Sequence, residues 1–592
     1  MPSIINRTFL HSTHVRDTGM GEDAVVVSEL IKYDDGTVKP SLRVFNNPKR
    51  PFWFTKPEFQ NHKYKKEFER KERLDEFQVH NHELDKEVFR AVNGFAPNDR
   101  LTYGQKVKLY QNPYIYGANI DIQALIADKY RRDLEKHTQI PIPPTIGTLD
   151  IETSVRNDGT YGRIEIITYT HENESYTAIL KECMSETTED GRRDFSVSDV
   201  EELASQTIEP LIERLIGSAK GVDKIVSKFP MKREYFVGTY PIDLVRWIFS
   251  KINERKTSFI GIWNLDFDLP KILSCIEEAG LRPEDIFSPS TLDRRFRHFR
   301  YAQDTRKVQH PTNKWHVVHA TSNSRFIDAM CLYSYIRTAD GKEITYALDA
   351  IMKKHGLEGK FHWNLPKLGK ATKGKEWHLR MQQYYFKHYI VYNLGDTTPF
   401  QILEWVTQDI PMMLMLSEIT PLAKFPKQTV RATNTMYSEW KDRGWIIASV
   451  LENPVEDGDE DLTSKGGAVV SPKQFSAKGM KLFIEWPTHW TRCLAFGNDL
   501  DLSSQYPSAI QSMNISRGTQ IAAVVGITAP WVQKRYDPEI AVEVFFSYMI
   551  SQNANGVEIG KEFFQLKGYE EMSTSYDEYR KTKRKDYVRE AA

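Results

Sequence analysis

The stretch "TIGTLDIETS" (residues 145–154) decides the fold, because it reads as a strand that opens an α/β domain. Alternate residues of a strand share a face, so Asp150 and Glu152 point one way while Leu149 and Ile151 point the other. Two neighbouring carboxylates at a strand end can bind a divalent cation through oxygen ligands. A pair of solvated acids is the alternative for this triplet taken alone.

Strand-like and helix-like segments alternate from this stretch to about residue 410, which is typical of an α/β domain. The proline-rich segment "IPIPP" (140–144) precedes it and predicts a domain boundary. Farther along, "SFIGIW" (258–263) reads as a buried strand. The segment before it, "PIDLVRWIFSKI" (241–252), predicts a helix with one apolar face, formed by Ile242, Val245, Ile248 and Ile252.

A second acidic site follows that buried strand, in "IWNLDFDLPKIL" (262–273). Proline suits the first turn of a helix, so we expect a helix to start near Pro270 and Asp268 to lie at the corner before it. Helix capping is the alternative role for Asp268. Asp266 offers a competing carboxylate two residues away.

A third acidic site lies in "HYIVYNLGDTTPF" (388–400). Tyr392 and Asp396 are one helical turn apart and therefore project to the same side of a helix. A phenol beside a carboxylate can orient a metal-bound water. The alternative is a partly buried tyrosine near an ordinary helix-end aspartate.

The composition is that of an ordinary globular protein: 40% of the 592 residues are hydrophobic, 27% are charged, and the net charge is zero. Apolar runs such as "FIGIW" are too short to span a membrane, so we expect no membrane partner. Scattered cysteines and the lack of a secretory signal favour the cytoplasm. Three basic runs with aromatic residues could follow nucleic-acid phosphates, although each could also be a solvated helix face: 62–73, 293–307 and 580–589.

The acidic stretches, followed by "DLSSQYPS" (501–508), resemble the family B DNA polymerases, and among them the tailed-phage replicative enzymes most. In that family a proofreading exonuclease carries an Asp-x-Glu strand, then an Asn…Phe-Asp motif, then Tyr-x-x-x-Asp. The palm follows with Asp-x-x-Ser-x-Tyr-Pro-Ser. The motifs stand in this order here, as "DIE" at 150, "NLDFD" at 264, "YNLGD" at 392 and "DLSSQYPS" at 501.

The resemblance implies a ribonuclease-H-like 3′–5′ exonuclease that holds two Mg²⁺ or Mn²⁺ ions. Tyr392 would position the attacking water, and Asn264 and Phe267 would contact DNA. Because two residues rather than three separate Asn264 from Phe267 here, Asp266 stays open as an alternative to Asp268. The implied metal ligands are Asp150, Glu152, Asp268 and Asp396.

The resemblance also implies half of a polymerase site. Asp501 would bind a metal ion next to the incoming dNTP. Tyr506 would be the steric gate that excludes ribonucleotides. The backbone carbonyl of Leu502 would be a second ligand of that metal at the nucleotide site. Other residues of this half would contact the triphosphate (Ser504, Gln505, Arg580 and Arg584) or template phosphates (Gly466 and Gly467). Lys581 and Lys585 fit the triphosphate role nearly as well as the two arginines.

The implied organisation is a multi-domain α/β protein of viral DNA replication in an infected bacterial cell. Its predicted parts are an N-terminal domain (1–140), the exonuclease (141–410), a segment packing on the N-terminal domain (411–463), the first part of the palm (464–555) and the start of the fingers (556–592). The partners would be primer–template and single-stranded 3′ ends, dNTP and a second polypeptide. A truncated polymerase, a stand-alone exonuclease and a non-catalytic nucleic-acid-binding subunit are the alternatives.

We expect no primer extension by this chain alone. No second Asp-containing palm hairpin, of the Tyr-Gly-Asp-Thr-Asp-Ser type, follows Asp501, and nucleotidyl transfer needs two metal ions about 3.5–4 Å apart held by carboxylates on both sides. Primer extension should appear when a second chain supplies that hairpin. Gel assays of each chain and of the mixture check this, and robust extension by the 592-residue chain by itself would contradict it.

Overall fold

The computed structural model describes residues 2–449 apart from 63–64, 67, 156–160, 219–230, 309, 339–342, 358, 360–362 and 370–373, and adds two short strands farther along. The chain divides into two compact units. The first comprises residues 1–54, 68–102 and 115–449, and the second comprises 55–67, 103–114 and 450–592. None of the helices in the described part is long and apolar enough to span a membrane.

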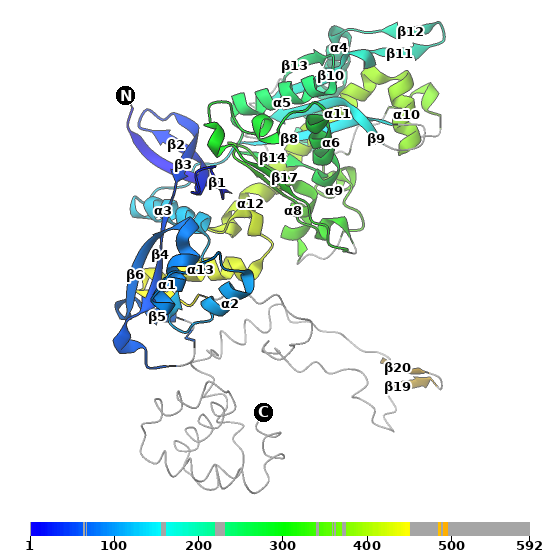
Figure 1. The fold of residues 1–592 in the computed structure, drawn as a ribbon. Helices are drawn as coiled ribbons and strands as arrows, with labels where there is room; N and C mark the ends of the chain where they lie inside the picture. The colour runs from blue at the N-terminus through cyan, green and yellow to red at the C-terminus, as the bar shows by residue number, and fades with distance from the viewer. Residues whose placement is uncertain are drawn as a thin grey trace. The chain divides into compact units, whose positions relative to one another are not determined.

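A six-stranded sheet in the order β13-β10-β9-β8-β14-β17 organises the larger unit (Figure 1). The pairs β8–β9 and β9–β10 are antiparallel, whereas β13, β14 and β17 each run parallel to a neighbour. Its strands are β8 (Ile146–Val155), β9 (Tyr161–His171), β10 (Glu174–Leu180), β13 (Lys232–Gly238), β14 (Phe259–Ile262) and β17 (Arg325–Asp328).

Helices cover both faces of this sheet, because its strands alternate apolar residues to both sides. On β9, Ile166 packs with the α4 and α11 side while Ile167 packs with the α5 and α6 side. The chain is therefore a mixed α/β protein with several sheets. The covering helices are α4 (Val197–Ser218), α11 (Phe386–Thr407), α5 (Pro241–Arg255) and α6 (Leu265–Glu278).

Smaller elements surround this core. The other helices of the larger unit are α1 (Leu84–Asn93), α3 (Ile122–Lys136), α7 (Pro283–Phe287), α8 (Ala329–Ile336), α9 (Leu348–Lys354), α10 (Lys375–Tyr384), α12 (Asp409–Ser417) and α13 (Gln428–Asp442). The smaller sheets are β1 (Ile4–Val15), β2 (Ala24–Tyr33) and β3 (Val38–Asn46); β6 (Leu74–His80), β4 (Lys49–Thr55) and β7 (Ile115–Tyr116); β11 (Ser185–Thr188) and β12 (Gly191–Asp194); β15 (Phe299–Ala302) and β16 (Val317–Ala320); and β18 (Trp445–Ile447) and β5 (Phe68–Arg70). The second unit contains α2 (Tyr103–Tyr110), β19 (Phe483–Trp486) and β20 (His489–Leu494).

The expected helix before the buried strand is confirmed. Helix α5 begins at Pro241, and the Asp243 carboxylate accepts a hydrogen bond from the Tyr240 amide at 2.9 Å. The predicted face is buried at Val245, Ile248 and Ile252, whereas Ile242 is half-buried against the same core. Strand β14 is buried throughout, as its sequence predicts.

The expected start of the next helix near Pro270 is wrong. Helix α6 begins at Leu265, because the Asn264 carbonyl accepts hydrogen bonds from the amides of Phe267 (3.0 Å) and Asp268 (3.2 Å). Pro270 lies inside the helix, where its ring removes one backbone hydrogen bond without ending the helix. Asp268 therefore lies in the first turn of α6.

The backbone of β8 lies unusually close to β9 at Gly147. A Cβ added there would lie 2.7 Å from the Thr170 carbonyl oxygen and 2.9 Å from Cε2 of Tyr169. We expect Gly147→Ala to lower the free energy of unfolding by about 1–3 kcal/mol, because the backbone of β9 cannot yield without disturbing the sheet. Urea denaturation followed by circular dichroism measures this.

Gly395→Ala is the matched control. Its added Cβ would meet Cδ1 of Ile208 at 3.5 Å, an ordinary contact, and alanine is favoured over glycine inside a helix by about 1 kcal/mol. Equal stability of the two variants would show that the close approach of β8 to β9 is unimportant.

Candidate metal-binding cleft

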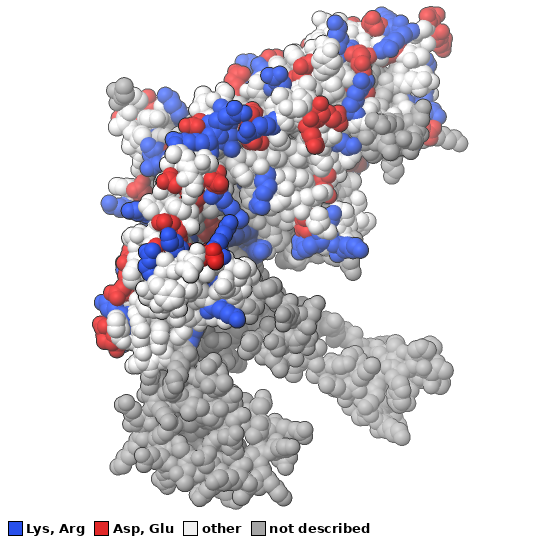
Figure 2. Space-filling view, viewed as in Figure 1, with Lys and Arg blue, Asp and Glu red and all other residues white. Residues whose placement is uncertain are grey.

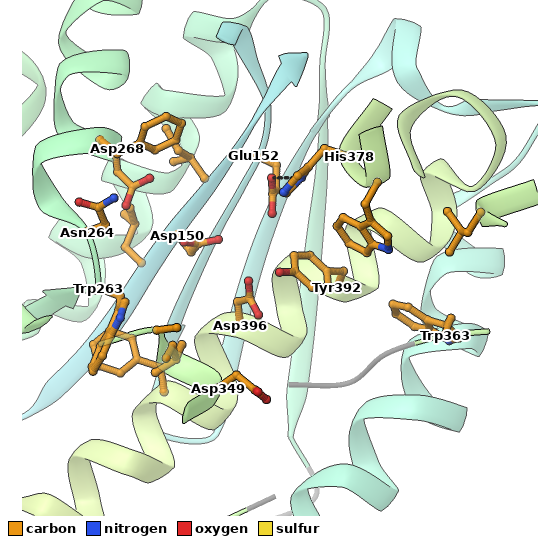
Figure 3. A pocket seen from close by; sticks show the side chains of 18 of the residues that line it. Asp150, Glu152, Trp263, Asn264, Asp268, Asp349, Trp363, His378, Tyr392 and Asp396 are labelled. Atoms are coloured by element: carbon orange, nitrogen blue, oxygen red, sulfur yellow. Dashed lines mark ion pairs between the residues drawn. The ribbon is translucent and has the colours of Figure 1, made fainter. Parts of the chain in front are cut away.

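Three carboxylates from two distant elements meet at one point. Asp150 and Glu152 project from β8, and Asp396 projects from α11 toward them (Figure 3). Each offers a ligand oxygen, and these oxygens lie within 4.8 Å of one another. Leu149 and Ile151 pack into the core on the opposite face of the strand, as the alternation predicts. This group could hold a metal ion.

Buried hydrogen bonds hold α11 against the sheet. The Thr148 hydroxyl donates to the Thr397 carbonyl oxygen at 2.8 Å, and the Thr170 hydroxyl donates to the Thr397 hydroxyl at 2.9 Å. One turn farther, the Gln401 amide donates to the Ile146 carbonyl oxygen at 3.1 Å. Because these contacts lie directly beside Asp396, they fix its position relative to Asp150.

Two residues of α11 hold the carboxylates of β8. The Asn393 amide donates to Oδ2 of Asp150 at 2.6 Å, and the Tyr389 hydroxyl donates to Oε2 of Glu152. Burial and the neighbouring Glu152 raise the pKa of Tyr389 well above its usual value, so the hydroxyl keeps its proton. Hydrogen-bonded partners of this kind orient metal ligands in proteins.

His378 extends this arrangement from α10. Its Nδ1 lies 2.8 Å from the Tyr389 hydroxyl. The same nitrogen lies 3.7 Å from Oε2 of Glu152 (Figure 3). Also from α10, the Gln382 amide donates to the Thr153 carbonyl oxygen at 2.8 Å and accepts from the Val155 amide at 3.0 Å. These two bonds lie at a register shift of β8 between Glu152 and Thr153, and they hold the irregular strand end in place.

The carboxylates line a cleft of about 910 Å³. Asp268, Tyr392, Asn264 and Phe267, which the motifs single out, line the same cleft. Asp268 is buried but lies outside the group of three close carboxylates. The remaining wall is largely aromatic and aliphatic, and it includes Trp263, Trp363, Trp377, Leu348, Leu365, Leu368 and Phe400.

Asp266 has other contacts. Its Oδ1 accepts hydrogen bonds from the Gln303 amide at 2.6 Å and from the Tyr301 hydroxyl at 3.2 Å, and its Oδ2 lies 3.7 Å from Nζ of Lys314. Asp266 is not among the residues that line the cleft, whereas Asp268 is. The geometry therefore separates the two aspartates that the sequence leaves open.

The polymerase half of the motif set lies outside the described residues. This holds for Asp501, Leu502, Ser504, Gln505, Tyr506, Arg580, Arg584, Gly466 and Gly467. Their predicted roles stay predictions.

Sequence reasoning missed three contributors to the cleft. Tyr389 and Asn393 precede Asp396 by seven and three residues and therefore share its helical face, so the periodicity of α11 could have identified them. His378 carries no such signal, because it reaches the site through the packing of α10 on α11.

Comparison with known proteins adds no identification. No protein-family model matches the chain, and no curated protein is similar enough in sequence to match it.

Tyr389→Phe should weaken divalent-cation binding by about tenfold or more, because Glu152 loses the hydroxyl that orients its carboxylate. Isothermal titration with Mn²⁺ measures the change. Tyr333→Phe is the matched control, since it removes another buried hydroxyl, which lies 2.9 Å from Nε2 of His355 outside the cleft lining. Equal Mn²⁺ affinity of the two variants would show that Tyr389 does not position Glu152.

Proposed function

We propose that residues 141–410 form a 3′–5′ DNA exonuclease of the ribonuclease-H-like type, the proofreading part of a phage-like family B DNA polymerase. The observation that carries the proposal is the meeting of Asp150, Glu152 and Asp396, whose ligand oxygens lie within 4.8 Å of one another. Asp268 and Tyr392 on the same cleft complete the acid and phenol set of that family's exonuclease motifs.

The sheet supports the assignment to this fold type. An antiparallel run of β10, β9 and β8 continues into the parallel strands β14 and β17, with helices on both faces. The acids come from the central strand β8 and from helices α6 and α11 that pack on the sheet. Such a site concentrates acids from distant parts of the chain at one strand.

The donor set fits Mg²⁺ or Mn²⁺. Carboxylate oxygens are the hard ligands that these cations prefer, and magnesium needs few protein carboxylates because it keeps several waters. When bound, a pair of such ions supplies an activated water and stabilises the leaving 3′ oxygen of a phosphodiester. The close group of possible ligands found among the described residues of the cleft consists of carboxylates and includes neither the histidines nor the cysteines that typify zinc sites.

The protein's own residues would hold and orient the reacting groups. Asp150 and Glu152, fixed by Asn393 and Tyr389, present their carboxylates without a large rearrangement. Tyr392 lies one turn before Asp396 on the same cleft, where its hydroxyl can orient the attacking water. Its ring centroid lies 4.8 Å from that of Trp377, a contact that limits the movement of the ring.

The rest of the cleft suits a single strand of DNA. Unpaired bases stack on aromatic side chains, and Trp263, Trp363, Trp377 and Phe267 line this cleft. A duplex cannot offer its bases to such a wall without being opened. The substrate we propose is therefore an unpaired 3′ end, as proofreading requires.

The polymerase part of the proposal rests on sequence. The motif "DLSSQYPS" (501–508) supports a palm segment that binds dNTP and the primer–template through half of an active site. A second polypeptide carrying the remaining palm, fingers and thumb would complete that site.

The nuclease assay should separate the two neighbouring aspartates. We expect the purified chain to degrade single-stranded DNA from the 3′ end with Mg²⁺, and Asp268→Asn to abolish cleavage with the fold intact. Asp266→Asn should be mild, because this carboxylate bonds to Tyr301 and Gln303 instead of lining the cleft.

Asp150→Ala should lower the rate by several powers of ten, since it removes a ligand and the charge stabilisation that depends on it. Gel analysis of 5′-labelled oligonucleotides measures all three variants. A wild-type chain without magnesium-dependent cleavage would refute the proposed function, and reversed effects of the two asparagine variants would refute the assignment of Asp268.

A further inference from the structure

Arg325 is a buried cation without a counter-charge. It opens β17, the edge strand of the six-stranded sheet, and only 5% of its surface is exposed. Within the described part of the chain, its guanidinium forms neither an ion pair with a carboxylate nor a side-chain hydrogen bond. Burial alone lowers the pKa of Arg325 to about 10. Buried charges in proteins are normally paired, so this one calls for an anion.

The surroundings of Arg325 are also cationic. Nη2 of Arg300, an exposed residue of β15, lies 3.1 Å from Nε2 of His319 on β16. Burial, followed by the positive charges of Arg325, Arg300, His298 and Arg16, lowers the pKa of His319 far below its usual value of 6.5 to about 3. The geometry brings the same segments together: Arg300 pairs with His319 across β15 and β16, and the Thr13 hydroxyl, three residues before Arg16, donates to the Ala320 carbonyl oxygen at the end of β16 at 2.8 Å. Arg325 follows Ala320 by five residues, at the start of β17.

Arg16 and Arg300 differ from the other arginines nearby in that no carboxylate pairs with them among the described residues. The other arginines of the basic run 293–307 have carboxylate partners: Arg294 and Arg297 with Asp285, Arg295 with Asp293, and Arg306 with Asp304. Arg300 and Arg16 have no such partner among the described residues, and both are exposed. Glu284 is the acid that acts on nearby His298, but it is already paired with Arg282.

The cationic group is separate from the cleft. Strands β14 and β17 run parallel, so Arg325 pairs with Phe259 at the start of β14, whereas Trp263 and Asn264 of the cleft follow its end. A strand of this length spans roughly 10 Å between its first and last residues. Figure 2 shows a band of Lys and Arg side chains on the viewed face beside the β1–β3 sheet.

We propose that Arg16, Arg300 and Arg325 form a phosphate-binding site in which a backbone phosphate of a DNA strand supplies the missing negative charge. Guanidinium groups bind phosphate oxygens through paired hydrogen bonds, and three of them around one phosphate give a strong, sequence-independent contact. The inference rests on the proposed function in taking DNA as the ligand. It adds a place, outside the cleft, where the strand is held.

DNA binding in EDTA tests the site without cleavage. A fluorescein-labelled single-stranded 20-mer is titrated with wild type, Arg16→Gln, Arg300→Gln and Arg325→Gln, and the anisotropy is followed from low to high salt. Each substitution should reduce the slope of log K against log salt by about 0.7, which is about a fivefold loss of affinity at 0.1 M salt. Arg294→Gln, an exposed arginine of the same run that is paired with Asp285, should change the slope less.

Thermal unfolding with inorganic phosphate against chloride, at equal ionic strength, identifies the source of the anion. Phosphate should raise the melting temperature of wild type but not that of Arg325→Gln, and Arg325→Gln should be no less stable than wild type without phosphate. If Arg325→Gln does not fold, the same comparison of phosphate with chloride is made with Arg16→Gln and Arg300→Gln, and phosphate should stabilise these two variants less than wild type. A phosphate effect with unchanged DNA binding in these variants would assign the site to free phosphate and overturn the DNA contact.

Equal salt slopes in all variants, together with no phosphate effect, would overturn the site itself. These outcomes are independent of the nuclease assay. An arginine effect on binding in a chain without nuclease activity would refute the proposed exonuclease and leave the phosphate site standing.

Discussion

The mutual repulsion of three carboxylates within 4.8 Å is the constraint on which the rest of the structure depends. Without a cation, like charges at this distance destabilise one another, and partial burial of Glu152 and Asp396 strengthens the effect. The fold holds them together through packing elsewhere: Thr148, Thr170 and Gln401 tie α11 to the sheet by buried hydrogen bonds. A divalent cation bound among the three carboxylates, as proposed above, would offset their repulsion and stabilise the fold.

The cleft and the arginine group of the larger unit have different chemistry. The cleft combines acids with tryptophan and aliphatic side chains, which suits bases next to a metal-bound phosphodiester. Among the described residues, Arg325 and Arg300 have no carboxylate partner; Arg325 lies at the end of β17 away from the cleft, and Arg300 lies on β15. Because these arginines lie away from the three carboxylates, they do not neutralise the negative charge that would bind a metal ion. A chain with zero net charge can in this way still carry a local positive field.

Periodicity predicted the parts of the site that local geometry controls. The two faces of β8, the buried face of α5 and the shared side of Tyr392 and Asp396 all follow from side-chain spacing. The start of α6 did not, because the expected start relied on Pro270, whereas the helix begins at Leu265, five residues earlier, and contains this proline. The choice of Asp268 over Asp266, and the part played by His378, depend on which segments pack together. Such contacts join residues far apart in sequence and leave no local pattern.

The span between β8 and α11 has a consequence for how the protein is made. Asn393 and Asp150 are hydrogen-bonded across 243 residues of sequence. At 5–20 residues per second, a ribosome needs roughly 12–50 s to add that length. Strands β8, β9 and β10 can form hairpins early, but their acidic face waits for a helix that emerges last among the elements of the cleft. A nascent or prematurely ended chain therefore lacks the assembled group of three carboxylates, and the nuclease proposed above could not act before the domain is complete.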